Sequence, residues 1–593
     1  MNQFLTKHKK LISFLLACFC MYYLSFTHII AYNSLIKSNS FSALIYLAAF
    51  TALFYWVMGH ANRRQVLCAL SAGFIFACCI CIGSEFVATQ MFNYTYVMIY
   101  LGILALTCVL TACITMVIYF FPKIIHFIKY SRMTALTDRL FHHRHSFRIL
   151  MVLILILWIP AFLAVFPGIY SYDAGPQVWQ LFSDHRLDAH HPVIHTLILD
   201  GCFYIGHAVT GDYNNGLVLY SVIQALFMAA VFAYAIDTMK KYKVPSPVQL
   251  VSLLFLAVNP ISQVWVFTTT KDTMFGGFFL LLFLRMIDIV IHPEEFFSSR
   301  KKIILFIITA ILTCLFRNQG IYVFLLCIPF MIIGLKNYRK QFLIFSLIPV
   351  IIVKVLTGPV SSALDIKEPN SREALSVPIQ QIARVFYYNP GSIDEQTKET
   401  VYKYIPAKYL KGYIAATSDP VKEGFNDKQF KKDPVSFFKA WAQIGIINPQ
   451  IYIDSFLYGS YGYFYPDQTP YWIHFILFDG AYMEHKNNIL DIERHSLLPG
   501  YESYLRSVSI DLSHEKIPVI SFILNQAFPF WMMIFVGSLL LYKKRYKEMI
   551  PLLLIFGFWG TNLLGPLIAI RYAYPIIVCV PTMAGLLFYP KKD

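Results

Sequence analysis

The amino-acid sequence predicts an all-α protein that crosses a membrane many times. Of its 593 residues, 57% are hydrophobic and 14% are charged, which is more apolar surface than a soluble protein needs. Runs of about twenty apolar residues recur, the length of a bilayer-spanning helix. Lys and Arg gather in the short loops between these runs, as in cytoplasmic loops, so the net charge of +16 does not indicate a nucleic-acid partner.

The apolar runs predict about fourteen spans: four before residue 148, seven up to residue 356 and three after residue 517. They are Leu11–Ile30, Phe41–Met58, Gln65–Ser84, Tyr96–Phe121, Ile149–Phe166, Gly216–Ile236, Val248–Phe267, Thr273–Ile291, Ile303–Phe316, Ile321–Leu335, Phe342–Leu356, Pro518–Tyr542, Ile550–Leu564 and Tyr572–Tyr589.

The basic loops fall on alternate sides of these spans, which predicts that both termini are cytoplasmic. One further apolar stretch, Val193–Val209, is not counted as a span. If it crossed the bilayer, Lys240, Lys241 and every later basic loop would lie outside. We therefore expect residues 193–209 to form a helix that lies in the outer interface.

The spans divide the chain into four parts. Residues 1–147 form an N-terminal four-span module, and residues 148–356 form a membrane core with a first outer loop at 167–215. Residues 357–517 are expected to be extracytoplasmic and mostly helical. A capping box at Ser392–Glu395 and the pair Asp433-Pro434 each predict the start of a helix there. Residues 518–593 are expected to complete the core.

The first outer loop holds groups that can transfer protons or bind phosphate: Asp173, His190, His191 and His195. Asp272 falls in the next outer turn. Carboxylates and cations that gather on one side at bilayer depth are candidates for a functional site. Each alone could instead be a helix cap, a surface ion pair or a snorkelling anchor, so their common side is the stronger signal.

Arg317 lies in a short hairpin, Ile303–Leu335. An arm of about fifteen residues reaches ~22 Å, which is less than the ~30 Å of hydrocarbon, so Arg317 is expected below the outer surface. There it needs an anion or a water-filled cavity, unless it snorkels or the bilayer thins. The other candidates on this side are Arg372, Arg384, Arg571 and Tyr572.

Several chemistries leave no motif in the sequence. The P-loop G-x-x-x-x-G-K-[ST], the dinucleotide fingerprint G-x-G-x-x-G and the zinc motif H-E-x-x-H do not occur. The tract His142-His143-Arg144-His145 lies in a basic inner loop, where a solvated stretch facing lipid head groups is favoured over a metal site.

The order of parts resembles the GT-C superfamily of membrane glycosyltransferases, which includes protein O-mannosyltransferases and aminoarabinose transferases. In that family an early outer loop carries an acid, a short interfacial helix follows a basic-Pro motif, and a second acid lies in the next outer turn. The matching positions here are Asp173, His190-His191-Pro192 and Asp272. Ala174 stands where mannosyltransferases have a paired acid, so the sugar and any divalent cation remain unassigned.

The likeness extends from about Arg148 to the C-terminus and leaves out the first four spans. It is strongest to an uncharacterised branch in Gram-positive bacteria that shares the Tyr-Asp, His-His-Pro, Ser-Arg-Glu-Ala-Leu-Ser and Gly-Tyr-Phe-Tyr-Pro elements. The segments that begin at Phe316 and Arg571 also resemble such proteins. The resemblance implies a GT-C-like core.

These observations predict a glycosyltransferase that moves a sugar from a polyprenyl-phosphate donor to a cell-envelope glycan, lipid or protein at the outer face. Asp173 is the expected base, and Asp272 is expected to orient it or to help hold a metal. The histidines and arginines are expected to contact the donor. Two alternatives stay open: a transporter of lipid-linked sugar precursors, and an outer-face glycan polymerase or ligase.

Overall fold

The computed structural model describes residues 8–26, 41–171, 173–467 and 488–589. Within these residues the chain is all-α, and strand-like pairing is limited to isolated bridges. The predicted fold class is therefore confirmed at this level. The end of the predicted span Leu11–Ile30, Tyr172 of the Tyr-Asp element and part of the 357–517 segment lie outside the described residues.

The helices follow one another along the chain with the following bounds. They are α2 (Lys9–Leu24), α3 (Phe41–His60), α4 (Arg63–Thr89), α5 (Val97–Lys129), α6 (Arg132–Phe141), α7 (Ser146–Ala164), α8 (Ala174–Phe182), α9 (Val193–Thr210), α10 (Asn214–Lys241), α11 (Ser246–Ala257), α12 (Pro260–Trp265), α13 (Lys271–Ile291), α14 (Pro293–Phe297), α15 (Arg300–Phe316), α16 (Gln319–Gly334), α17 (Arg339–Val355), α18 (Ser361–Ala363), α19 (Ser376–Tyr388), α20 (Glu395–Tyr404), α21 (Ala407–Leu410), α22 (Asp419–Lys422), α23 (Asp427–Lys432), α24 (Pro434–Ile447), α25 (Pro449–Tyr458), α26 (Pro499–Ser509), α27 (Pro518–Leu524), α28 (Phe528–Tyr542), α29 (Tyr546–Met549), α30 (Leu552–Asn562), α31 (Ile570–Ile577) and α32 (Val580–Gly585).

Among the described residues, eight helices are long and apolar enough to cross a membrane, and the bent pair α27–α28 makes up to nine. These helices make the chain a multi-pass membrane protein. The sequence predicts fourteen spans, but fewer of the described helices are long enough to cross a membrane. Several of the predicted apolar runs are divided into shorter helices. The run Val248–Phe267 divides at Asn259-Pro260, where the Asn259 side chain caps α12 and Pro260 supplies no N–H to continue α11.

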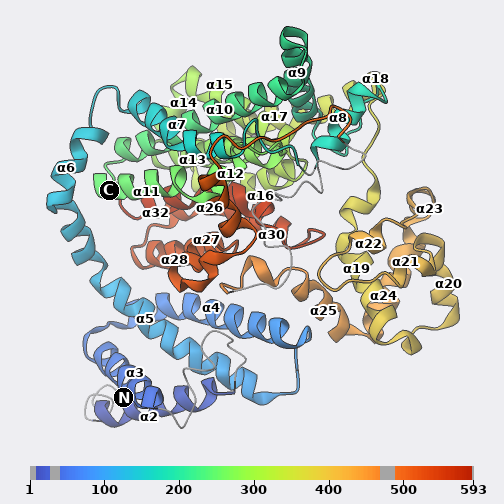
Figure 1. The fold of residues 1–593 in the computed structure, drawn as a ribbon. Coiled ribbons are helices and arrows are strands. Elements are labelled where there is room, and N and C mark those ends of the chain that lie inside the picture. The colour runs from blue at the N-terminus through green and yellow to red at the C-terminus, as the bar shows by residue number, and fades with distance from the viewer. Residues whose placement is uncertain (1–7, 27–40, 172, 468–487, 590–593) are drawn as a thin grey trace.

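Helix α9 differs from the expected interfacial helix in one respect, since its length and composition are sufficient to cross a membrane. It packs against the start of α10. Gly206 meets the backbone of Gly216, and the His195 ring reaches the Tyr220 hydroxyl at 2.8 Å. Figure 1 shows α9 projecting beyond the helices of the core.

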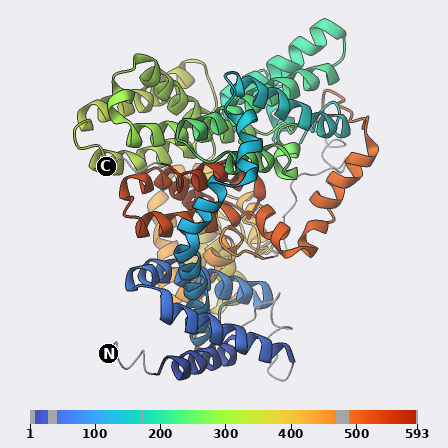
Figure 2. The same cartoon turned by 90° about the vertical axis from the view of Figure 1, so that its left-hand side faces the viewer.

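Three regions are visible in the ribbon. Helices α2–α5 form the N-terminal region, the core lies beside it, and α19–α25 form a separate helical body (Figure 1). This body has its own apolar core, which includes Ile382, Val401 and Phe437. Figure 2 shows α5 and α6 running from the N-terminal region along the core.

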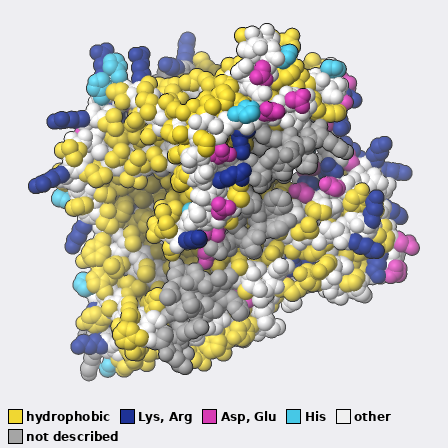
Figure 3. Space-filling model, viewed as in Figure 1, with side chains coloured by type: hydrophobic (Ala, Val, Ile, Leu, Met, Phe, Trp, Pro, Cys, Tyr) yellow, Lys and Arg dark blue, Asp and Glu magenta, His cyan; other side chains and the backbone are white. Residues whose placement is uncertain are grey.

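The basic loops gather at one end of the core. Lys241 and Lys302, which begin or end separate helices, both pair with Asp288, at 2.6 and 3.0 Å. Lys543 lies over the Phe121 ring, and Arg64 donates to the Leu541 carbonyl. We call this the basic end. In Figure 3 Lys and Arg side chains line the margin at this side, next to a wide hydrophobic surface.

The N-terminal region is bound to both other regions. Tyr94 donates a 2.8 Å hydrogen bond to Asp454 of α25, and Arg384 of α19 donates to the carbonyl oxygen of Gln90. The ring of Phe76 stacks on Trp531 of α28 with centroids 4.0 Å apart. The region therefore bridges the helical body and the C-terminal helices.

Parallel backbone pairing joins the first outer loop to the start of α13. The Ile169 N–H donates to the Phe267 carbonyl at 2.8 Å, and the Thr269 N–H donates to the Ile169 carbonyl at 3.0 Å. Asp173 lies four residues after Ile169, and Lys271 and Asp272 lie four residues after Phe267 and Thr268. The pairing therefore sets Asp173 beside the residues that open α13.

Gly168 permits this pairing. Its φ of +148° is disfavoured for L side chains, and an added Cβ would meet the Ser221 Oγ atom. We expect Gly168→Ala to lower thermal stability in detergent and to displace the Ile169–Asp173 segment. Gly500→Ala is the matched control, because a Cβ there meets nothing within 4 Å. Equal melting temperatures for the two variants would contradict this role.

Candidate functional site

Asp173 lies at the centre of a cluster of charged side chains. It occupies the N-cap position of α8 without a side-chain capping bond, and its Oδ2 atom is 2.7 Å from the Lys271 Nζ atom. Arg571 Nη1 lies 3.6 Å from the other carboxylate oxygen, and His191 Nδ1 lies 3.8 Å from Oδ2. The three charged side chains are each under one fifth exposed, so the cluster is shielded but open to a ligand.

Asp272 does not contact Asp173 but pairs with Arg317. Arg317 Nη1 is 2.7 Å from Asp272 Oδ1, and the Thr270 hydroxyl donates to Asp272 Oδ2 at 3.1 Å. The Asp272 side chain is fully buried and that of Arg317 is 10% exposed. Thus the sequence-based expectation of a partner anion for Arg317 is met within the chain itself.

Tyr572 connects the two ion pairs. Its ring centroid lies 5.0 Å from the Arg317 Cζ atom and 4.7 Å from the Arg571 Cζ atom, and Arg571 Nη2 donates to its hydroxyl at 2.8 Å. We call Asp173, Lys271, Asp272, Arg317, Arg571 and Tyr572 the ion-pair cluster. Among the described residues, its three cations face two carboxylates, a balance of one positive charge.

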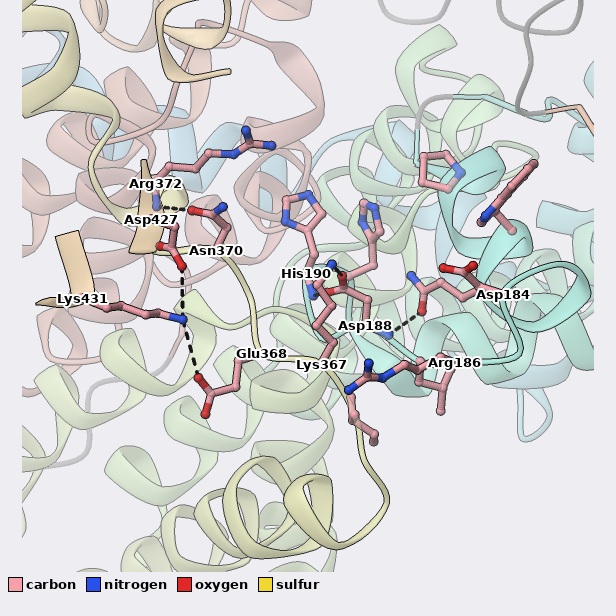
Figure 4. Close-up of a pocket in the computed structure, with 16 residues that line it drawn as sticks. Asp184, Arg186, Asp188, His190, Lys367, Glu368, Asn370, Arg372, Asp427 and Lys431 are labelled. Atoms are coloured by element: carbon pink, nitrogen blue, oxygen red, sulfur yellow. Dashed lines mark hydrogen bonds and ion pairs between the residues drawn. The ribbon is translucent and has the colours of Figure 1, made fainter. Parts of the chain in front are cut away.

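A polar cavity of about 720 Å³ adjoins this cluster. His191 belongs to both, because it lines the cavity and its Nδ1 atom is 3.3 Å from Lys271 Nζ. Figure 4 shows the cavity between the 184–190 loop on one side and residues 366–372 and 427–431 on the other, with Arg372 extending toward His190. Backbone pairing of Asp188 with Lys367 holds the two walls together.

The predicted histidines have different surroundings. His190 is exposed on the cavity wall, whereas His191 is buried. Burial and the nearby Lys271 lower the pKa of His191 to about 3, so this ring is neutral at pH 7. His195 is fully buried and contacts the Gln177 amide at 2.9 Å and the Tyr220 hydroxyl at 2.8 Å. It braces α8 and α9 against α10 and does not line the cavity.

Arg372 and Arg384 lie apart from the ion-pair cluster. Arg372 pairs with Glu373 at 3.2 Å and lines the far wall of the cavity. Arg384 is fully buried where the helical body meets the N-terminal region, and it donates to the Tyr413 hydroxyl at 3.0 Å. Its contacts there are those of a residue that holds two regions together.

The Gly-Tyr-Phe-Tyr element supports the cluster from behind. The Tyr463 hydroxyl accepts from the Ala569 N–H at 3.0 Å and lies 3.1 Å from the Leu567 carbonyl. Ser418 N–H also donates to the carbonyl of Pro566. These bonds fix the backbone that leads into Arg571 and Tyr572. In the sequence, this element is only part of the family resemblance, and its contacts make Tyr463 a positioning residue.

Within the described ranges, no group of three or more His, Cys, Asp or Glu side chains is arranged to hold a metal ion. Asp173 and Asp272 each already face cationic side chains. The two acids are thus placed to balance cations of this chain.

A model of a protein family, described as a family of unknown function (DUF6020), matches residues 182–592. The chain belongs to the DUF6020 family. The DUF6020 match contains Asp272, Arg317, Arg571 and the part of the polar cavity from residue 184 onward. It leaves out Asp173, the cavity residues Pro176, Trp179 and Gln180, and the N-terminal region. No curated protein and no solved structure matches the chain.

Lys271 was not among the residues singled out from the sequence. The available signal was its position next to Asp272 at an outer turn, because neighbouring side chains at the start of a helix point about 100° apart and so face different partners. In this DUF6020 protein, Lys271 faces Asp173 while Asp272 faces Arg317.

Lys271 also controls the ionisation of Asp173. Burial alone would raise the pKa of the Asp173 carboxyl, but Lys271 and Arg571 hold it well below its usual range. A depressed pKa contributes stability that is present above the unfolded value of about 4 and is lost as pH falls through the folded value.

We therefore expect Lys271→Gln to melt at a lower temperature than the wild type at pH 7, with a gap that narrows below about pH 4. Thermal unfolding between pH 7 and pH 3 measures this. Lys367→Gln is the control, because this lysine is 66% exposed where it pairs with Asp188. A difference in melting temperature that stays constant from pH 7 to pH 3 would contradict the role of Lys271 in holding the pKa of Asp173 low.

Proposed function

We propose that the protein is a membrane glycosyltransferase that moves a sugar from a polyprenyl-phosphate donor to a cell-envelope glycan, lipid or protein at the outer face. The observation that supports this best is the ion-pair cluster with its one surplus positive charge, next to a polar cavity and opposite the basic end. The resemblance of the Asp173, His-His-Pro and Asp272 elements to the GT-C superfamily supports the same function.

The charge of the cluster suits such a donor. Nucleotide sugars are not available outside the cytoplasmic membrane, so a transferase there needs a sugar already attached to a lipid. A polyprenyl-phosphate sugar is a phosphodiester with one negative charge, which matches the single surplus positive charge. Arg571 and Arg317 present guanidinium groups, which bind phosphate oxygens in pairs.

The proposed reaction balances at named groups. The acceptor hydroxyl attacks the anomeric carbon, the bond between this carbon and the phosphate oxygen breaks, and Asp173 takes the hydroxyl proton. The departing polyprenyl phosphate gains a second negative charge, which Lys271 and Arg571 stabilise.

Asp173 becomes a stronger base when the donor binds. In the free site Lys271 and Arg571 hold its pKa low. A bound phosphate shares these two cations and weakens their hold on the carboxylate, so the pKa of Asp173 rises toward the range that proton transfer requires.

The polar cavity suits the acceptor. It is lined by charged side chains of both signs and by Trp179, which is 41% exposed. Carboxylates and guanidinium groups bond to hydroxyls, and an indole ring packs on a sugar face. His191 connects this cavity to Asp173, so an acceptor hydroxyl there lies near the proposed base.

The test uses the full chain in vesicles with polyprenyl-phosphate sugars labelled in the sugar, together with a cell-envelope extract. Label that moves from lipid to the extract, with release of polyprenyl phosphate, supports the proposal. Movement of labelled lipid across the bilayer without transfer would favour a transporter and overturn it. Transfer of whole glycan blocks, seen in product length, would favour a polymerase or ligase.

A further inference from the structure

A second cavity, of about 740 Å³, lies at the basic end. It opens where two candidate spans, α5 and α10, finish, which places it at the depth of a bilayer surface. Four lysines and two aspartates face it, together with apolar side chains. The lining includes Lys129, Lys240, Lys241, Lys243, Asp138, Asp237, Ile125, Val244, Pro245 and Phe588.

Two of the lysines are committed to protein groups. Lys240 donates to Ser146 Oγ at 3.0 Å, and Lys241 pairs with Asp288 at 2.6 Å. Lys129 and Lys243 are exposed, and no carboxylate of the described residues pairs with either. These two ammonium groups are therefore available to an external anion.

The backbone at Lys243 is unusual. Its φ is +58°, and the N–H groups of Lys243 and Val244 close the end of α10 by bonding back to Lys240 and Met239. Glycine usually fills this left-handed position after a helix, because it has no Cβ. A lysine in this conformation costs conformational free energy, and Lys243 nevertheless occupies this position in the lining of the basic cavity.

The surroundings are those of a lipid interface. Beside the cavity, α5 and α6 expose Phe127, Tyr130 and Leu136, at 74%, 68% and 76%. Ser131 caps α6 between them, and Leu136 of this short helix is exposed next to the lysines. Acyl chains can pack on such side chains while a head group enters the cavity.

We propose that this cavity binds the head group of an anionic phospholipid, with its phosphate on Lys129 and Lys243. Basic pockets between membrane helices bind such head groups in known proteins. Asp138 and Asp237 lie on the same lining, which favours a head group with hydroxyls to donate over one with further negative charge. The proposal does not depend on the glycosyltransferase function.

The test measures lipid retention by the full-length protein. The protein is reconstituted in vesicles of phosphatidylglycerol or of phosphatidylcholine, extracted in detergent, and weighed by native mass spectrometry. We expect the wild type to keep phosphatidylglycerol but not phosphatidylcholine. The double variant Lys129→Gln/Lys243→Gln should bind phosphatidylglycerol roughly tenfold more weakly.

Two further variants keep the proposal falsifiable. Lys336→Gln/Lys340→Gln removes two other lysines of the basic end that do not line the cavity and should retain lipid like the wild type. Lys243→Gly relieves the left-handed backbone, so it should be at least as stable as the wild type and yet bind lipid more weakly. Equal retention in all variants would overturn the proposal. If inorganic phosphate displaces the lipid at millimolar concentration, the site binds free phosphate instead.

Discussion

Replacing Asp173 by Asn should lower sugar transfer by about 10²–10⁴-fold, the range that a positioned general base contributes. The amide keeps the size of the carboxylate but cannot accept a proton. It also removes the charge that faces Lys271 and Arg571, so the donor phosphate loses a competitor for these cations. We therefore expect the fall in kcat, with a KM for the lipid donor that is unchanged or lower.

The control for this prediction is Asp212→Asn. Asp212 belongs to the same outer loop and is exposed, but it lines neither the polar cavity nor the ion-pair cluster. Transfer that is unchanged in Asp173→Asn, or that falls equally in both variants, would remove the base role from Asp173. Protein levels in the membrane, measured for each variant, separate loss of chemistry from loss of folding.

Replacing Asp272 by Ala should destabilise the protein by about 3–5 kcal/mol, because it leaves the Arg317 charge buried without its carboxylate. The pair is far from water, with Asp272 fully buried and Arg317 enclosed by the rings of Phe275, Phe558 and Tyr572. Thermal unfolding in detergent measures the effect. Arg339→Ala, at an exposed arginine of the basic end, is the control.

A double variant separates the stability of this pair from its role in the reaction. Asp272→Leu/Arg317→Met fills the same space with apolar side chains, which often restores the stability lost when one partner is removed. We expect a melting temperature near that of the wild type but donor binding that stays weak, since the guanidinium group is gone. Recovery of transfer together with stability would show that the pair only supports the fold.

Of the candidate residues chosen from the sequence, Asp173, Asp272, Arg317 and Arg571 lie together at one end of the core, whereas Arg372 and Arg384 lie apart from them. Helix α13 begins at Lys271 and ends near Asp288, and α15 begins at the basic end and stops just before Arg317, as alternating basic loops require. The sequence could not show whether Lys271 or Asp272 faces Asp173. Lys271 and Asp272 are neighbours, and only the extended backbone before α13 decides which of them turns toward Asp173.

The number and continuity of the membrane helices were also beyond sequence patterns. Apolar runs such as Val248–Phe267 have the composition of one helix, and a single Asn-Pro pair within the run divides it. The pair α27–α28 bends by 91°, where α27 ends before Asn525, whose side chain accepts from the Ala527 N–H, and Pro529 lies in the first turn of α28. A hydropathy profile averages polarity over many residues, so it does not reveal such breaks. One Asn-Pro pair interrupts the helical hydrogen bonds but hardly changes the average.

The docking of the first helices has a consequence for how the molecule can be divided. Asp454, Arg384 and Trp531 each belong to the region that the DUF6020 family covers, and each finds its partner at Tyr94, Gln90 or Phe76, outside it. A chain shortened to the family region would leave a buried guanidinium and a stacked indole uncovered. The N-terminal helices thus act as an internal scaffold, and shared ancestry of residues 182–592 does not make them a self-sufficient folding unit.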